Sequence, residues 1–229
     1  NSLPIKQFAY HEGVQFAPSL LFYDTSGKII LRSTGYQTPE RFKKILNYLV
    51  DDHYLNQSLR DYLARDKTAT SAARLLSDPL FVEPPYALDR SHFPATKPLL
   101  VIFEATDCSA CGDFHKHVLS DQTVRETLSQ FEVVRLDGND KKTPVLTPDG
   151  QKSTPYDWYL STDLSQFPAL MFFDEKGNPV LSTDALILKG RMMNSLNFVL
   201  ERAYLKGWTY QRFARTKSLE RIQQQKQAN

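Results

Sequence analysis

The two cysteines of this chain, Cys108 and Cys111, lie three positions apart in the segment Cys108-Ser109-Ala110-Cys111, and the 229 residues contain no others. Two sulfurs at this spacing suit thiol–disulfide exchange, in which one thiolate attacks a disulfide and the second thiol resolves the mixed disulfide. An inert thiol pair and half of a zinc site are the alternatives. The sequence therefore predicts a redox dithiol, with Cys108 as the nucleophile and Cys111 as the more buried resolving partner.

The elements around the cysteines must hold them at a strand–helix junction. The apolar run 98–105 before them has the length and composition of a strand, and Phe114, Val118 and Leu119 recur after them at helical spacing. The unpaired N–H groups of the first helical turn would stabilise a thiolate at this junction. Asp107 opposes that effect, because it places a negative charge beside Cys108.

Two ionisable residues flank the motif. His115 falls between the two cysteines in angle on the predicted helix, so Cys108, Cys111 and His115 could converge on zinc or copper. The sequence offers no clear fourth ligand, and we expect His115 to flank the redox helix without a ligand role. Glu104 ends the predicted strand, where it could relay the proton of the resolving thiol. An exposed acid at a strand end is the interpretation that we prefer.

Phe167 and Pro168 form a second candidate region. A cis-proline at this position would turn backbone groups toward a bound peptide strand. A proline that opens a strand is also explained by strand geometry alone. We therefore treat Phe167 and Pro168 as candidates for substrate binding only because the cysteine motif is present.

A segment near the N-terminus is repeated 150 positions later without a gap. Each copy contains a strand, a turn with Asp and Gly, a second strand and a helix. The match extends over roughly fifty residues, and we interpret it as an internal duplication. The paired positions are Pro18 and Pro168, Asp24 and Asp174, Gly27 and Gly177, Leu31 and Leu181, Leu46 and Leu196, Asn47 and Asn197, and Tyr54 and Tyr204.

The two copies differ in what precedes them. The second follows a strand, the cysteine helix and a strand at Phe131–Leu136, whereas seventeen residues precede Pro18. We therefore expect residues 1–70 to be the C-terminal half of a first unit whose N-terminal half lies upstream or in a separate polypeptide. A small independent appendage is the alternative. Residues 71–97 are predicted to be a linker, and residues 98–229 a complete domain with a C-terminal helical extension.

Composition and charge limit the class of protein that this sequence can encode. The chain is 41% hydrophobic and 24% charged, as expected of a globular protein, and its net charge of +2 gives no reason to expect nucleic-acid binding. No apolar run approaches the roughly 18–20 residues that span a bilayer. The first residues show no signal peptide, which has either been removed or never existed.

Further helices are predicted near Phe8–Gly13, Pro39–Tyr54, Ser71–Ser77, Ser120–Ser129, Tyr156–Leu160 and Trp208–Phe213, the last followed by a polar tail.

The order of these elements is that of the thioredoxin fold. Residues 90–205 resemble thioredoxin-like thiol:disulfide oxidoreductases, most closely periplasmic ones of the SoxW-like kind, and residues 14–55 resemble the second half of such a domain. The resemblance implies an α/β fold with a central mixed sheet flanked by helices, in tandem with an incomplete first copy. The residues that carry it are Phe103, Glu104, Cys108, Cys111, Phe114, His115, the strand 133–137 and Pro168.

Carried over to this chain, the resemblance makes Cys108 the nucleophile, Cys111 the resolver and Pro168 the cis-proline beside them. It also implies an exported, periplasmic protein. Three departures leave the redox direction open. Asp107 stands where tryptophan is common, Ser109-Ala110 replaces Gly-Pro, and Ile102 stands at the usual buried aspartate, with Glu104 a substitute on the same strand face.

The leading hypothesis is a thiol:disulfide oxidoreductase that needs no cofactor and acts on proteins carrying disulfides or dithiols. The missing half of the first unit is a further expected partner. A metal-binding or metal-delivery module using Cys108, Cys111 and His115 is one alternative. A non-catalytic module, in which the duplicated fold serves as a docking surface, is the other.

Overall fold

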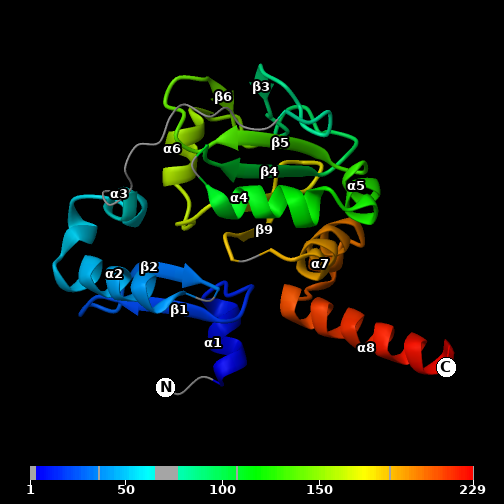
Figure 1. Cartoon of the computed structure of the whole chain (residues 1–229), viewed down its shortest axis with the longest axis horizontal. Helices are drawn as coiled ribbons and strands as arrows, with labels where there is room; N and C mark the ends of the chain where they lie inside the picture. The colour runs from blue at the N-terminus through cyan, green and yellow to red at the C-terminus, as the bar shows by residue number, and fades with distance from the viewer. Residues whose placement is uncertain (1–3, 36, 65–76, 107, 186, 229) are drawn as a thin grey trace.

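A four-stranded mixed sheet forms the centre of the larger unit. The computed structural model describes residues 4–35, 37–64, 77–106, 108–185 and 187–228. The strand order is β5-β4-β8-β9, with β4 parallel to β5 and antiparallel to β8. Together with its flanking helices, this sheet confirms the predicted α/β class (Figure 1). The strands are β4 (Leu99–Glu104), β5 (Glu132–Asp137), β8 (Ala169–Phe173) and β9 (Pro179–Thr183).

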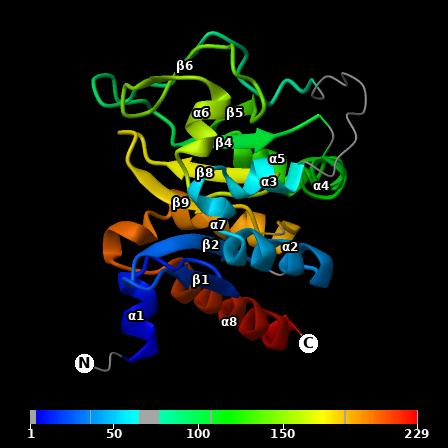
Figure 2. The same cartoon turned by 90° about the vertical axis from the view of Figure 1, so that its left-hand side faces the viewer.

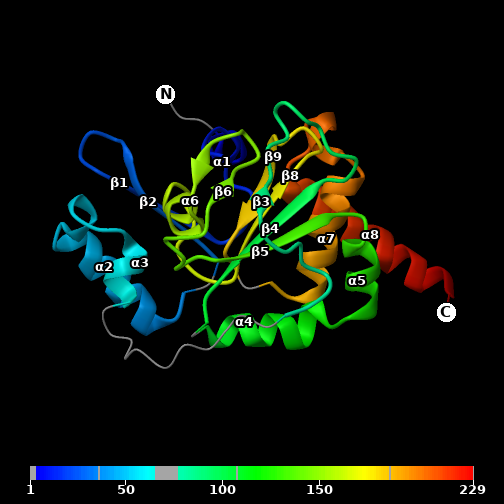
Figure 3. The same ribbon diagram turned by 90° about the horizontal axis from the view of Figure 1, so that it is seen from above.

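Strand β4 has a separate core on each of its faces. Leu100 and Ile102 belong to one buried cluster, and Leu99, Val101 and Phe103 belong to the other. Successive side chains of a strand point to opposite faces, so a central strand covered on both sides is apolar throughout. Figure 3 shows α6 on one side of the sheet and α5 and α7 on the other. The helices of this unit are α4 (Ser109–Phe114), α5 (Gln122–Leu128), α6 (Pro155–Leu160), α7 (Lys189–Leu200) and α8 (Tyr210–Ala228).

The N-terminal unit lies beyond the β9 edge of this sheet (Figures 1 and 2). It has a small core of its own around Ile45, Tyr48 and Leu59. Phe16 joins it to the main core, since its ring lies 4.6 Å from that of Tyr210. The elements of this unit are α1 (Ile5–His11), β1 (Ser19–Tyr23), β2 (Ile29–Thr34), α2 (Pro39–Val50), the 3₁₀ turn η1 (His53–Leu55) and α3 (Leu59–Ala64).

The β1–β2 and β8–β9 hairpins have matching turns. Asp24 Oδ1 accepts hydrogen bonds from the backbone N–H groups of Ser26 and Lys28, and Asp174 Oδ1 accepts from those of Lys176 and Asn178. Gly27 and Gly177 each have positive φ, at 85° and 81°. This agreement fits the expected tandem arrangement.

The two hairpins differ in their neighbours. Strand β8 pairs with β4, whereas among the described residues β1 pairs with β2 alone. The difference is visible in one matched pair of side chains: Leu170 on β8 is completely buried, while its counterpart Leu20 on β1 is 39% exposed.

We expect Leu170→Ala to lower the free energy of unfolding by about 2–5 kcal/mol, because it leaves a cavity in the core. The matched variant Leu20→Ala should cost less than about 1 kcal/mol, because half-exposed leucines lose little burial. Urea denaturation of both variants measures the difference. Equal costs would mean that Leu20 is already covered in solution.

Residues 78–97, part of the linker expected at residues 71–97, pack onto the larger unit. Phe81 and Leu88 are buried, and β3 (Tyr86–Ala87) pairs in parallel with β6 (Val145–Leu146), which in turn pairs with β7 (Lys152–Ser153). The buried guanidinium of Arg90 lies 2.6 Å from the carboxylate of Glu132 on β5. This stretch therefore contributes to the fold around the sheet.

Several helix boundaries differ from the prediction, among them those of α1, which spans Ile5–His11 and not Phe8–Gly13. The polar tail after Phe213 is helical, because α8 continues to Ala228 through Lys, Glu, Arg and Gln residues with high helix propensity. Helix α2 ends at Val50 and not near Tyr54. The helix predicted at Ser71–Ser77 falls, apart from Ser77, outside the described residues. No described helix combines the length and apolar character needed to cross a membrane.

Candidate active site

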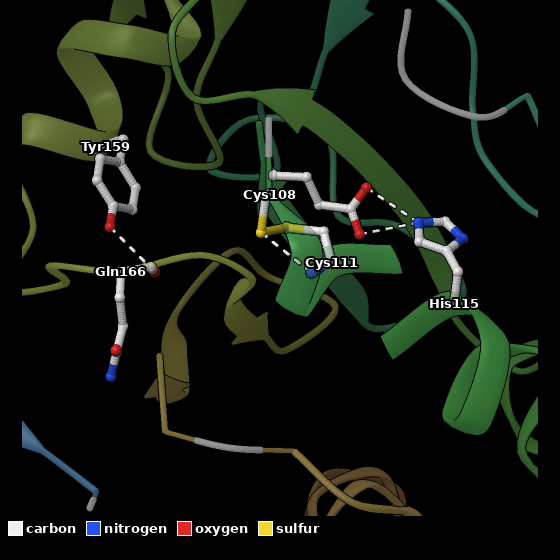
Figure 4. Close-up of a disulfide and its surroundings, with 6 residues drawn as sticks. Cys108, Cys111, His115, Tyr159 and Gln166 are labelled. Atoms are coloured by element: carbon white, nitrogen blue, oxygen red, sulfur yellow. Dashed lines mark hydrogen bonds and ion pairs between the residues drawn. A yellow bond between two sulfur atoms is a disulfide. The ribbon is translucent and has the colours of Figure 1, made fainter. Parts of the chain in front are cut away.

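The two cysteines lie where β4 gives way to α4, as predicted. Cys108 is the N-cap of α4 and forms a disulfide with Cys111, with the two Cα atoms 5.2 Å apart (Figure 4). The backbone N–H of Cys111 donates a hydrogen bond to Cys108 Sγ at 3.0 Å. Cys111 is 4% exposed, and Cys108 is only partly buried. Cys108 therefore presents the more accessible sulfur, beside the N–H groups that favour a thiolate.

Glu104 is the last residue of β4, and the preferred interpretation of it as an exposed acid is wrong. The residue is 1% exposed, because β4 is an inner strand that lies between β5 and β8. Both carboxylate oxygens accept from His115 Nε2, at 2.9 and 3.0 Å. A buried carboxylate is thus paired with a partly buried imidazole next to the cysteine helix.

His115 begins a π-helical turn, His115–Leu119, in which α4 widens after Phe114. Such turns are frequent at functional sites. Here the turn directs Nε2 to Glu104 and not to the sulfurs, which are bonded to each other. Within the described ranges, no group of three or more His, Cys, Asp or Glu side chains is placed to hold a metal ion. Asp107 lies outside those ranges.

Pro168 lies at the same end of the sheet as the cysteines. Strand β8 is antiparallel to β4 with Ala169 opposite Phe103, so Pro168 falls next to the end of β4 from which Cys108 follows. The Phe167–Pro168 peptide bond is cis. The structure therefore brings together Cys108, Cys111, Glu104 and Pro168.

The segment before Pro168 is held by two residues that sequence reasoning did not single out. Asp184 accepts hydrogen bonds from the backbone N–H groups of Ser165 and Gln166, at 2.8 and 3.2 Å. The Tyr159 hydroxyl donates to the carbonyl oxygen of Gln166 at 3.1 Å (Figure 4). Burial raises the pKa of both Asp184 and Tyr159, which keeps the Tyr159 hydroxyl protonated as a donor.

Phe167 packs against Gly138, the residue that follows β5. A Cβ placed on Gly138 would lie 2.5 Å from Cζ of the Phe167 ring, so only glycine leaves room for this contact. The ring centre of Phe167 also lies 4.7 Å from that of Tyr159. Phe167 is therefore fixed on two sides next to Pro168. No pattern in the sequence marked Gly138, because its contact is made across the fold.

The chain matches a known protein family. Residues 4–50 and 94–199 match the family described as a thioredoxin-like domain. The two matched stretches correspond to the two units and fit a tandem arrangement. A comparison with curated proteins finds no match.

Comparison with solved structures finds a protein of the same kind of fold, followed by two weaker matches. A thioredoxin-fold protein from Helicobacter pylori is 14% identical with a TM-score of 0.52, over 61% of this chain and 92% of that chain. A thioredoxin from Thermus thermophilus is 19% identical with a TM-score of 0.38, over 49% of this chain and 80% of that chain. The reduced C-terminal domain of DsbD from Neisseria meningitidis is 14% identical with a TM-score of 0.33, over 47% of this chain and 84% of that chain. The likeness in fold rests on the Helicobacter pylori protein.

Proposed function

Because the chain belongs to the thioredoxin-like domain family, we propose that it is a thiol:disulfide oxidoreductase that exchanges disulfides with partner proteins through Cys108 and Cys111. One observation carries this proposal above all. The two sulfurs are bonded to each other at the N-terminus of α4, and Cys108 is the more accessible of them. A redox-active pair requires this combination of a reachable sulfur and a neighbouring resolving sulfur.

In the reducing direction, the Cys108 thiolate attacks one sulfur of a partner disulfide. An S–S bond forms between Cys108 and the partner, and the other partner sulfur leaves as a thiolate. Cys111 then loses its proton and attacks Cys108 Sγ, which releases the second partner sulfur and closes the Cys108–Cys111 disulfide. The partner gains two electrons, and the dithiol loses them. In the oxidising direction, the same steps run in reverse.

Glu104 is the proposed acceptor of the Cys111 proton. It is the buried carboxylate at the strand end that leads to the motif, and His115 holds both of its oxygens. A positioned base of this kind accelerates the step in which the resolving thiol ionises. His115 is then a positioning residue and not a metal ligand.

Phe167 and Pro168 are the proposed substrate-binding residues. They lie at the same end of the sheet as Cys108, and Tyr159, Asp184 and Gly138 fix the segment that contains them. An extended stretch of the partner, running beside the cysteine that carries the reacting sulfur, would pair with the backbone there.

The partner and the compartment are also part of the proposal. We place the protein in the periplasm or another exported setting, where disulfide exchange with folded proteins occurs. We further propose that a strand and helix of the β4–α4 kind complete the N-terminal unit. A hollow of about 430 Å³ lies beside β1, lined by Pro18, Leu20 and Phe42 among others. The counterparts of Leu20 and Phe42, Leu170 and Met192, are fully buried in the cluster that contains Ile102 and Phe114.

Turnover of a protein disulfide tests the proposed activity. With insulin as the probe and glutathione or dithiothreitol to recycle the dithiol, the intact chain should catalyse exchange above the uncatalysed rate. A Cys108→Ser, Cys111→Ser double variant is the control and should show none. If the intact chain exchanges disulfides no faster than the double variant, both at the uncatalysed rate, the proposal is rejected and a non-catalytic binding module remains.

A further inference from the structure

Arg60 on α3 extends from the N-terminal unit to the end of the sheet where the disulfide lies. Its Nη1 donates a hydrogen bond to the carbonyl oxygen of Gly138 at 2.7 Å. Its guanidinium carbon lies 4.6 Å from the ring centre of Tyr156, 5.2 Å from that of Tyr159 and 5.7 Å from that of Phe167. The side chain is partly buried in this position.

The groups that Arg60 contacts are those that fix the proposed substrate-binding segment. Phe167 precedes Pro168, and Tyr159 donates to Gln166 just before them. Gly138 packs against the Phe167 ring, and its backbone N–H donates to the carbonyl oxygen of Glu104 at 2.8 Å. Arg60 of the N-terminal unit therefore contacts both groups that hold the Phe167 ring, Gly138 and Tyr159.

The chemistry of arginine suits this arrangement better than that of any other cation. The planar guanidinium can lie against aromatic rings and still donate hydrogen bonds at its edge. A second contact supports the same junction, since the Tyr156 hydroxyl lies 3.4 Å from Asp61 Oδ2, next to Arg60 on α3. The N-terminal unit is thus attached at the proposed substrate site and not only through the core contact of Phe16.

We infer that Arg60 is a positioning residue for substrate: it holds Phe167 and the Gly138 turn in place, so that binding of the partner peptide at Phe167–Pro168 depends on the N-terminal unit. This inference rests on the proposed function. It assigns Arg60 no contact with the reacting sulfurs. Loss of Arg60 should therefore weaken substrate binding and leave the chemistry of the dithiol intact.

Kinetics of Arg60→Ala and Arg60→Lys test the inference. With insulin as substrate, Arg60→Ala should raise KM about 10-fold and leave kcat within about twofold of the unaltered chain, as expected when binding geometry alone is lost. Alkylation of reduced Cys108 by iodoacetamide and the midpoint potential of the dithiol should not change. Arg60→Lys should have a KM between those of Arg60→Ala and the unaltered chain. An ammonium keeps the charge but lacks the planar arrangement of donors that a guanidinium has.

Two further variants keep the test decisive. Gly138→Ala displaces the Phe167 ring from the other side, so it should also raise KM, even if Arg60→Ala folds poorly. Arg212→Ala is the matched control: it removes a guanidinium that lies 4.3 Å from the ring centre of Trp208, on a different part of the surface, and KM should be unchanged.

The outcomes separate the inference from the activity on which it rests. An active unaltered chain whose KM is unchanged in both Arg60→Ala and Gly138→Ala would overturn the inference alone. Equal losses in kcat, Cys108 alkylation and thermal stability would also overturn it, because Arg60 would then have a general structural role. An inactive unaltered chain would reject the proposed function itself.

Discussion

A Cys111→Ser variant will accumulate a mixed disulfide between Cys108 and a partner protein, whereas a Cys108→Ser variant will form none. Cys108 is the more accessible sulfur, and it lies at the helix N-terminus, where the backbone N–H of Cys111 points at it. Cys111 is buried, and in the proposed mechanism it attacks Cys108 Sγ and not the partner. Both variants should lose at least about 1,000-fold in turnover, since each lacks one of two obligatory sulfurs.

Non-reducing electrophoresis and intact mass of the protein mixed with insulin measure the trapped species. The double variant Cys108→Ser, Cys111→Ser controls for non-covalent association. Trapping through Cys111 in the Cys108→Ser variant, at a rate similar to that of the Cys111→Ser variant, would reverse the assigned roles.

Replacing Glu104 with glutamine should slow the release of a preformed mixed disulfide by about 100-fold, the usual range for loss of a positioned base. The amide keeps the shape of the side chain but cannot accept the proton of Cys111. His115→Ala should slow the same step less, because the carboxylate remains. It should lower the free energy of unfolding by about 1–3 kcal/mol, since the buried Glu104 loses the donor that contacts both of its oxygens.

Rapid-quench measurement of mixed-disulfide resolution separates this step from the first attack. Glu132→Gln is the matched control, because it breaks an ion pair with Arg90 at the opposite end of β5. That variant should be less stable but should resolve the mixed disulfide at the normal rate. Resolution by Glu104→Gln at the rate of the unaltered chain would remove Glu104 from the mechanism.

The sequence predicted the parts of the site that local pattern determines. The apolar run before Cys108 and the helical spacing after Cys111 set the strand–helix junction. The repeat at a constant offset predicted both hairpins, since Asp24 and Asp174 form the same turn. These features depend on residues close together in the chain.

What the sequence did not predict depends on contacts across the fold. The burial of Glu104 follows from the position of β4 between β5 and β8, which alternation within a strand cannot reveal. Tyr159 and Asp184 act through backbone groups of the segment 165–166, and no spacing rule links them to it. Arg60 contacts Gly138 across 78 positions of sequence, and only the packing of the two units brings them together.

A redox titration of the Cys108–Cys111 pair against glutathione or dithiothreitol, followed by the mass shift on alkylation, tests the central claim most directly. We predict a reversible two-electron transition with a midpoint between about −270 and −120 mV, the range of exchange-active dithiols. The position within that range would separate a reductase from a disulfide donor. A midpoint below about −300 mV, as in structural disulfides, would contradict the account.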